Sequence, residues 1–243
     1  MNTILVLNPN TSEAMTEDIA KSAEQAASPQ TETIVTNPDI GPESLESYYE
    51  YHLAAIAMLE TIADYRGEVD GVVIACYGDP GLYPLKEVFD VPVVGVAEAS
   101  LATATLLGHR FSILVALPRA IPMMENMVHW YGLSNRLASV ESTNLSVLEL
   151  EEDKDETVDA LSRAGERAKD AGAEVLILGC SGMAGLQKRV AERTAVPVID
   201  PVENAVKMVG LLAEQGLVQS EAGLYQTPPK KDIRGDMPGD LSR

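Results

Sequence analysis

The sequence is poor in cysteine, histidine and basic residues, and each shortage excludes a class of protein. Its two cysteines are too few for a disulfide-rich secreted scaffold. Its three histidines, His52, His109 and His129, have no spacing typical of metal ligands, so we predict no metal site. Lys and Arg number 18 against 37 Asp and Glu, giving a net charge of −19. This balance argues against binding to nucleic acid or to an anionic membrane, because both need clustered positive charge.

Long hydrophobic runs and aromatic residues are also scarce. No apolar stretch approaches the roughly 18 residues of a membrane span, and the sequence does not open on the basic and apolar pattern of a secretory signal. We therefore expect a cytoplasmic protein whose cysteines are thiols. Aromatic residues make up 5% of the chain and apolar residues 46%, so we expect a core of mainly aliphatic side chains.

Short β-branched segments alternate with helical patterns along the whole chain. Strands are predicted at 3–7, 31–36, 71–75, 91–96, 111–116, 137–141, 174–178 and 196–199. Helices are predicted at 12–27, 45–65, 81–89, 119–131, 153–171, 184–193 and 203–216, the first with Thr11 or Ser12 as its N-cap. This alternation predicts an α/β fold with parallel sheets that are covered by helices.

The second half of the chain repeats the first. "GVVIACYGDPGL" at 71–82 aligns with "EVLILGCSGMAGL" at 174–186, so that Cys76 matches Cys180. The further matched pairs are Gly78 with Gly182, Gly81 with Gly185 and, after one inserted residue, Pro92 with Pro197 and Glu98 with Glu203. "ILVLNP" at 4–9 likewise matches "ILVALP" at 113–118. The pattern indicates an internal duplication. It predicts two pseudo-symmetric lobes, each a parallel sheet flanked by helices.

The duplication also predicts the domain organisation and the place of the site. We expect residues 1–97 and about 204–223 to form the first lobe and 98–203 the second, with a boundary near 97–110. Residues 224–243, rich in Pro, Gly and charge, are predicted to be a tail that is disordered alone or packs on a partner subunit. Sites on parallel sheets form beyond the carboxyl ends of the strands, where both cysteines fall. The active site is thus expected in the cleft between the lobes.

Two thiols on opposite sides of a cleft suit proton transfer at carbon. A helix N-terminus favours a thiolate, and glycine-rich turns let backbone N–H groups approach a small anion or an oxyanion. One thiolate could remove a proton from a carbon beside a carbonyl, and the opposite thiol could return a proton to the other face. Such a reaction requires no metal and no cofactor.

Other interpretations of these residues stay open. Buried cysteines are often inert small hydrophobes, and a structural disulfide is unusual in the cytosol. "GCSGMAG" is neither the dinucleotide fingerprint nor a P-loop, so the sequence gives little support to a nucleotide site. Asn8, at the end of the first strand, could donate to a substrate carbonyl or ureide, or simply form a turn. Tyr48 and Tyr51 share a helix face, which favours packing over substrate contact.

Seven segments of the chain together resemble the hydantoin racemases and the closely related allantoin racemases of the aspartate/glutamate racemase superfamily. They are "ILVLNPNTS", "GPESLESYYE", "IACYGDPGL", "VPVVGVAEAS", "RFSILVALPR", "LGCSGMAGL" and "VPVID", and the resemblance runs from residue 1 to about 216. It implies a site between two α/β lobes and no cofactor. It further implies that two cysteines, here Cys76 and Cys180, act as acid and base. The positions that it implies for substrate binding are Asn8, Tyr77, Gly78, Ser181 and Gly182.

The chain departs from the family pattern near the expected pocket. Relatives often have Phe where this chain has Tyr77, and often Thr within the segment that matches Val115 and Ala116. These differences leave the side chain of the substrate open. We predict a cofactor-independent, two-base racemase of 5-substituted hydantoins, allantoin among the candidates, that acts on a small molecule as a homo-oligomer. The alternatives are an amino-acid racemase, a maleate isomerase, or a non-catalytic small-ligand binding protein; a decarboxylase is disfavoured because its one-base arrangement needs a single cysteine.

Overall fold

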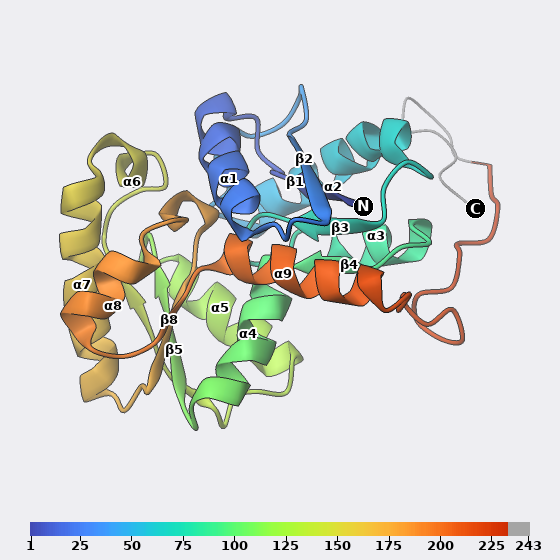
Figure 1. Ribbon diagram of the computed structural model, residues 1–243. Coiled ribbons are helices and arrows are strands. Elements are labelled where there is room, and N and C mark those ends of the chain that lie inside the picture. The colour runs from blue at the N-terminus through green and yellow to red at the C-terminus, as the bar shows by residue number, and fades with distance from the viewer. Residues whose placement is uncertain (233–243) are drawn as a thin grey trace.

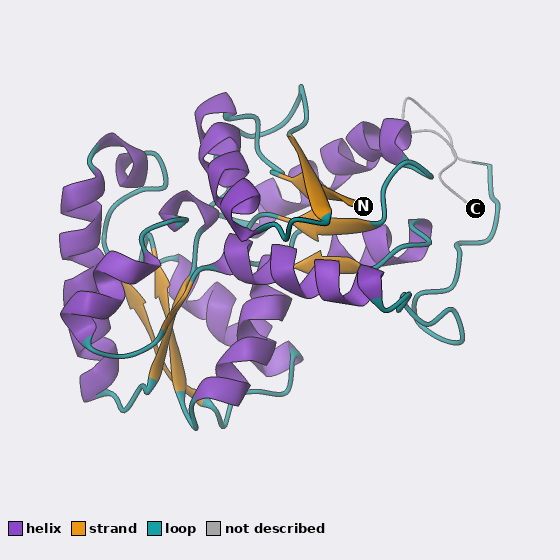
Figure 2. Ribbon diagram, viewed as in Figure 1, coloured by secondary structure: helices purple, strands orange, loops and turns teal. Residues whose placement is uncertain are grey.

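The computed structural model describes residues 1–232 and contains two four-stranded parallel sheets. The first has the strand order β2-β1-β3-β4, with β1 at Asn2–Leu7, β2 at Thr31–Thr36, β3 at Gly71–Ile74 and β4 at Val93–Gly95. The second has the order β6-β5-β7-β8, with β5 at Phe111–Val115, β6 at Leu137–Ser142, β7 at Val175–Leu178 and β8 at Val198–Ile199. Figure 2 shows the sheets as two separate groups of arrows. The predicted two-lobed α/β fold is confirmed.

Helices connect the strands and cover the sheets (Figure 1). They are α1 (Glu13–Ala26), α2 (Tyr48–Thr61), α3 (Leu82–Val88), α4 (Val96–Leu107), α5 (Ala120–Trp130), α6 (Glu149–Glu152), α7 (Lys154–Asp170), α8 (Gln187–Thr194) and α9 (Pro201–Glu214). Helix α9 follows the last strand of the second sheet but packs on β1, β3 and β4 of the first, beside α1 and α4. No helix within residues 1–232 has both the length and the apolar character to cross a bilayer.

The two sheets place their cysteines at equivalent points. In the first sheet Leu7 of β1 pairs with Ile74 of β3, and in the second Leu114 of β5 pairs with Leu178 of β7. Cys76 lies two residues after Ile74, and Cys180 lies two residues after Leu178. The shared strand order and register support the internal duplication that the sequence indicates.

Strand β3 shows how the core is divided. Val73 and Ala75 join a buried cluster that also includes the core of the second lobe, whereas Val72 and Ile74 join a second cluster beneath α2 and α3. A strand that is buried on both faces is typical of a parallel sheet with helices on both sides. The end of β3 is therefore held rigidly where the chain turns toward Cys76.

Helix α4 corrects the sequence analysis, which predicts no helix between 97 and 110. The segment "VAEASLATATLL" is almost wholly apolar or small, so it has no polar face that marks a helix. Its N-cap is Gly95, which has no side chain to signal a helix start. The cap comes instead from Asp79, whose carboxylate accepts hydrogen bonds from the N–H groups of Ala97 at 2.9 Å and Glu98 at 2.8 Å. Because the capping side chain comes from a distant turn, the sequence next to α4 contains no signal of a helix start.

The segment after α9 packs on the first lobe. The side-chain amide of Gln219 donates to the carbonyl of Val91 at 2.9 Å, and its oxygen accepts from the N–H of Val93 at 3.0 Å. Further on, Tyr225 stacks on Tyr83 with ring centroids 6.3 Å apart. The described start of the predicted tail at 224–243 thus contacts its own subunit, and residues 233–243 lie outside the described residues.

Candidate functional site

Cys76 and Cys180 line one pocket of about 40 Å³ at the carboxyl ends of β3 and β7. Both cysteines are thiols. Most of the remaining lining is apolar and includes Leu45, Val115, Ala116, Met123, Met124 and Val147, while Glu46 and Arg119 are its charged members. These residues come from segments of both lobes. The pocket therefore lies between the lobes, as the sequence predicts.

The two thiols stand on matching turns. The N–H of Asp79 donates to the carbonyl of Cys76 at 3.0 Å, and the N–H of Met183 donates to the carbonyl of Cys180 at 3.1 Å. In the first turn Gly78 has a φ of +121°, a conformation that favours glycine. A Cβ at Gly78 would also lie 2.6 Å from the ring and hydroxyl of Tyr51. The turn after Cys76 therefore depends on the absence of a side chain.

Tyr51 is a pocket residue that sequence reasoning missed. It lines the pocket, and its hydroxyl donates to the carbonyl of Tyr77 at 2.9 Å. Burial, followed by the charges of the two thiols, raises the pKa of Tyr51 well above its ordinary value, so the hydroxyl remains a donor. The predicted packing is also present, because the rings of Tyr48 and Tyr51 meet edge to face at 6.1 Å. The bond to Tyr77 joins distant segments, and no local pattern indicates it.

Tyr77 and Ser181 directly follow the two cysteines and share an unusual environment. Each side chain is 3% exposed. The hydroxyl oxygens of both are buried and have no hydrogen-bond partner among residues 1–232. Leaving a buried hydroxyl unsatisfied typically costs about 1–3 kcal/mol. The two halves of the chain thus carry the same unsatisfied group at the same position.

Asn8 lies in a different setting. Its side chain is fully buried, and its amide donates to Asn10 Oδ1 and Thr16 Oγ1, both at 2.9 Å, beside the N-cap Ser12 of α1. The amide thus orders the turn into α1. A contact between Asn8 and a substrate stays a prediction.

Of the seven predicted site residues, three line the pocket. These are Cys76, Tyr77 and Cys180. The other four, Asn8, Gly78, Ser181 and Gly182, lie in the adjoining turns, outside the lining formed by the described part of the chain.

Burial dominates the electrostatics of the site. It raises the pKa of the Cys76 thiol well above its ordinary value, and the negative charges of Cys180 and Asp79 raise it further. The sequence argument that a helix N-terminus favours a thiolate is outweighed here. Helix α3 begins only at Leu82, so Cys76 lies outside its first turn. Burial therefore favours the thiol form of Cys76.

Asp79 is a further buried titratable group of the first turn, after Cys76 and Tyr77. Burial raises its carboxyl pKa to about 7, although the N–H groups of Ala97 and Glu98 hold it lower than burial alone would. The hydroxyl of Tyr131, at the end of α5 in the other lobe, donates to Asp79 at 3.2 Å. Within residues 1–232 no group of three or more His, Cys, Asp or Glu side chains is arranged to hold a metal ion.

The model of the Asp/Glu/Hydantoin racemase family matches residues 4–209. The chain belongs to this family. It is 40% identical over 236 residues to a hydantoin racemase from Pseudomonas sp. (strain NS671), covering 96% of this chain and 94% of that protein. The resemblance that the sequence motifs indicate is thereby confirmed.

Solved structures of racemases show the same fold. The allantoin racemase from Klebsiella pneumoniae is 39% identical, superposes with a TM-score of 0.94, and the match covers 100% of this chain and 99% of that one. The glutamate racemase from Francisella tularensis is 20% identical with a TM-score of 0.66, over 90% of this chain and 84% of that one, and shows a shared fold alone. The chain thus has the fold of known racemases, and its two cysteines line one pocket of that fold.

Proposed function

We propose that the protein is a cofactor-independent racemase of 5-substituted hydantoins, with Cys76 and Cys180 as its two bases. One observation carries the proposal. The two thiols stand on matching turns of two duplicated lobes and line the same pocket, in a chain of this racemase family. A substrate carbon between them would present one face to each thiol.

The reaction is a proton exchange at C5 of the hydantoin ring. The thiolate of one cysteine removes the C5 proton, and the electron pair moves into an enolate on the C4 oxygen. The thiol of the other cysteine then gives its proton to the opposite face of C5, which inverts the centre and leaves the charge on the second sulfur. Two thiolates so close together repel each other, so only one is charged at a time. The raised pKa of Cys76 makes it the proton donor whenever Cys180 carries the charge.

The turns supply the polar contacts. The hydroxyls of Tyr77 and Ser181 have no hydrogen-bond partner within residues 1–232. The hydantoin ring has two carbonyls and two N–H groups, so it offers both acceptors and donors to these hydroxyls. Backbone N–H groups of the turns at Gly78 and Gly182 would stabilise the enolate oxygen. Asn8 is retained as a candidate contact to a substrate carbonyl.

The lining of the pocket favours an apolar 5-substituent. Leu45, Met123, Met124 and Val147 are each at least nine-tenths buried and lie around the two thiols. The polar ureido group of allantoin would lack partners on this side, whereas Glu46 and Arg119, which also line the pocket, offer polar ones. Allantoin remains the second candidate, because the structural relative with a TM-score of 0.94 is an allantoin racemase.

A substrate panel tests the proposal. Purified protein, without added cofactor, is given each enantiomer of 5-isobutylhydantoin, 5-benzylhydantoin, allantoin, aspartate and glutamate, and optical rotation is followed. We expect racemisation of the hydantoins and none with the double variant Cys76→Ser, Cys180→Ser. Racemisation of a free amino acid alone would instead assign another reaction of the superfamily. Inactivity on the whole panel, with thiols that resist alkylation, would support the binding-protein alternative.

Two further expectations accompany this proposal and stay predictions. These are assembly into a homo-oligomer and a cytoplasmic location. Light scattering on the purified protein measures the assembly directly.

A further inference from the structure

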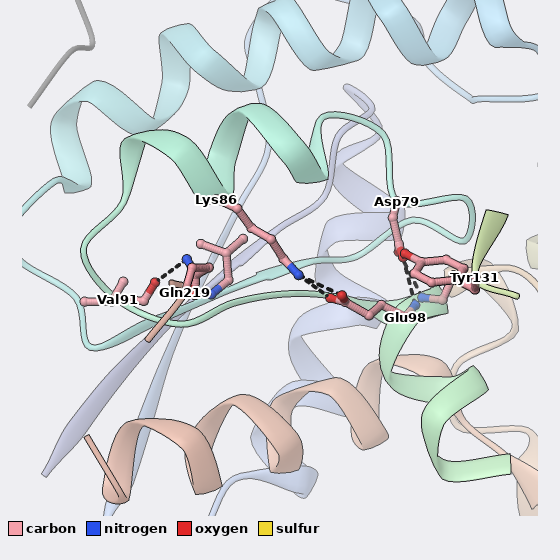
Figure 3. A network of polar contacts seen from close by, with 8 residues as sticks. Asp79, Lys86, Val91, Glu98, Tyr131 and Gln219 are labelled. Atoms are coloured by element: carbon pink, nitrogen blue, oxygen red, sulfur yellow. Dashed lines mark hydrogen bonds and ion pairs between the residues drawn. The ribbon is translucent and has the colours of Figure 1, made fainter. Parts of the chain in front are cut away.

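Asp79 ties the turn of Cys76 to the start of α4. Its N–H belongs to that turn and donates to the Cys76 carbonyl, while its carboxylate accepts from the N–H groups of Ala97 and Glu98. Figure 3 shows this carboxylate between the helix start and Tyr131. The residue adopts a positive φ of 49°, a conformation that is uncommon outside glycine and in which aspartate is one of the enriched residue types. Its hydrogen bonds to the turn and to α4 hold the residue in this conformation.

The second lobe makes the same link from the opposite end. Asp200 is the N-cap of α9, and its Oδ1 accepts from the N–H of Glu203 at 2.9 Å. Its Oδ2 accepts from the N–H of Gly185, in the turn of Cys180, at 2.6 Å. In each lobe one buried carboxylate therefore joins the cysteine turn to the helix that follows the next strand.

The duplication shows that the two carboxylates come from exchanged positions. In the alignment that matches Cys76 with Cys180, Asp79 falls on Met183. In the alignment that matches Glu98 with Glu203, Gly95 falls on Asp200. A Cβ at Gly95 would overlap the carboxylate of Asp79. The turn provides the carboxylate in the first lobe, and the N-cap provides it in the second.

The groups that face Asp79 come from several elements. Glu98 of α4 faces it and is held by Lys86 of α3 at 2.7 Å, and Tyr131 donates to it from the other lobe. Cys76 and Tyr77 of its own turn and Tyr51 of α2 also feel its charge. Asp79 thus lies where the Cys76 turn, α4 and the second lobe meet.

We infer that Asp79 and Asp200 are the positioning residues of the reaction, each fixing one thiol turn against the helix behind it. The inference rests on the proposed role of the two thiols. Neither carboxylate is required to touch the substrate. A displacement of about 1 Å in a reacting group can lower a rate about 10²-fold, so loss of either link should act chiefly on kcat.

The exchanged positions allow a rescue experiment. Asp79→Gly removes the carboxylate and relaxes the positive φ, and we expect it to lower kcat about 10²-fold with a smaller change in KM. Adding Gly95→Asp to Asp79→Gly recreates the arrangement of the second lobe in the first. The backbone at Gly95 is extended, with φ −84° and ψ 148°, which suits an N-cap side chain. We expect the double variant to recover most of the lost kcat.

A second readout does not depend on racemisation. In a Cys180→Ser background, the rate of Cys76 alkylation is followed against pH. Asp79→Gly removes a negative charge beside the thiol, so the midpoint should move to lower pH, and Gly95→Asp should return it toward the original value. The isosteric variant Asp79→Asn should move the midpoint in the same direction even if the double variant fails to fold.

Controls make each outcome decisive. Asp70→Gly removes a carboxylate that accepts the N–H of Thr3 at the amino end of β3, far from the pocket, and should leave kcat and the alkylation midpoint unchanged. Gly95→Asp alone should destabilise the protein because of its overlap with Asp79. The inference is overturned if the folded double variant is no more active than Asp79→Gly, or if Asp79→Asn leaves the midpoint in place. If the wild-type protein racemises nothing, the proposed function fails, while the alkylation measurements still test the link itself.

Discussion

The hydroxyl of Tyr51 donates to the backbone carbonyl of Tyr77 over 2.9 Å, which connects α2 to the residue directly after Cys76. This bond holds the ring of Tyr51 against Gly78, where a Cβ would have no room. The position of the Cys76 turn thus depends on a helix that is remote in sequence. Replacing either Tyr51 or Gly78 should therefore disturb the turn.

The first prediction concerns Tyr51→Phe, which removes the hydrogen bond and keeps the ring. We expect the free energy of unfolding to fall by about 0.5–1.5 kcal/mol and kcat/KM to fall up to about tenfold, because the carbonyl of Tyr77 loses its donor. Tyr49→Phe is the matched control, since Tyr49 lies on the same helix and is 75% exposed. Urea unfolding and racemisation kinetics measure both effects. Equal behaviour of the two variants would contradict the prediction.

Gly78→Ala provides the second prediction. Gly67 is a suitable comparison because it also has a positive φ, +81°, but no atom lies within 4 Å of the point that its Cβ would occupy, whereas a Cβ at Gly78 meets the ring of Tyr51. Both alanine variants strain the backbone by about 1–3 kcal/mol, and only Gly78→Ala also displaces Tyr51. We therefore expect activity to survive Gly67→Ala and to be largely lost in Gly78→Ala. Comparable activity in the two folded variants would show that the turn tolerates a side chain.

Single replacement of each thiol gives the third prediction. A serine hydroxyl is nearly the size of a thiol but far less acidic, so Cys76→Ser and Cys180→Ser should each lose one acid–base group, typically worth about 10²–10⁴ in rate. Racemisation should fall severely from either enantiomer. In deuterated water each variant should still exchange the C5 proton of one enantiomer, with opposite preferences.

Proton loss by NMR and inversion by chiral chromatography distinguish these outcomes, after correction for spontaneous exchange. A variant that racemises at the wild-type rate would remove its cysteine from the mechanism.

The fourth prediction concerns stability against pH. The carboxyl of Asp79 has a pKa of about 7 in the folded protein, above its ordinary value of 3.8. The folded state therefore holds this proton more tightly than the unfolded state. The stability that the protonated Asp79 contributes is fully present below pH 3.8 and is lost as the pH rises to about 7. Above about pH 7 this group causes no further change in stability.

Asp79→Asn does not titrate, so the difference in unfolding free energy between wild type and variant isolates this group. We expect the wild type to lose stability relative to the variant between about pH 5 and about pH 7, with no further loss up to about pH 9. Denaturant unfolding at each pH gives the difference. A gain for the wild type over the same interval would reverse the sign and contradict the raised pKa.

The fifth prediction concerns Gln219. Its side chain forms hydrogen bonds with backbone groups at the outer edge of β4, where the sheet has no further strand. Gln219→Ala leaves the N–H of Val93 and the carbonyl of Val91 without these bonds, so the free energy of unfolding should fall by about 1–2 kcal/mol. Gln25→Ala, at an exposed position of α1, is the control and should change it little. Thermal and urea unfolding compare the two.

Local patterns in the sequence are sufficient for the strands, for most helices and for the pocket position of both cysteines. The predicted strand at 31–36 coincides with β2, and the predicted helix at 12–27 contains α1 with Ser12 as its N-cap. These elements carry their own alternation, periodicity and caps. Strand ends in a duplicated parallel fold then bring Cys76 and Cys180 to one pocket without any knowledge of contacts.

The rest depends on contacts between segments that are distant in sequence. Helix α4 has no local start signal because Asp79 caps it from another turn. The pocket role of Tyr51 escapes prediction because its bond to Tyr77 spans 26 residues. The effect of the helix start on Cys76 is outweighed by burial, which raises the pKa of its thiol and which the sequence does not show. Each of these features requires three-dimensional information.

The exchanged carboxylates limit how two such lobes can diverge from a common half. In the first lobe, a form with aspartate both in the turn and at the N-cap is disfavoured, because a Cβ at Gly95 overlaps the Asp79 carboxylate unless that side chain moves and gives up its bonds to α4. A change that first removes the aspartate of the turn leaves a half with neither carboxylate, and the cysteine turn of that half then lacks its link to the helix behind it.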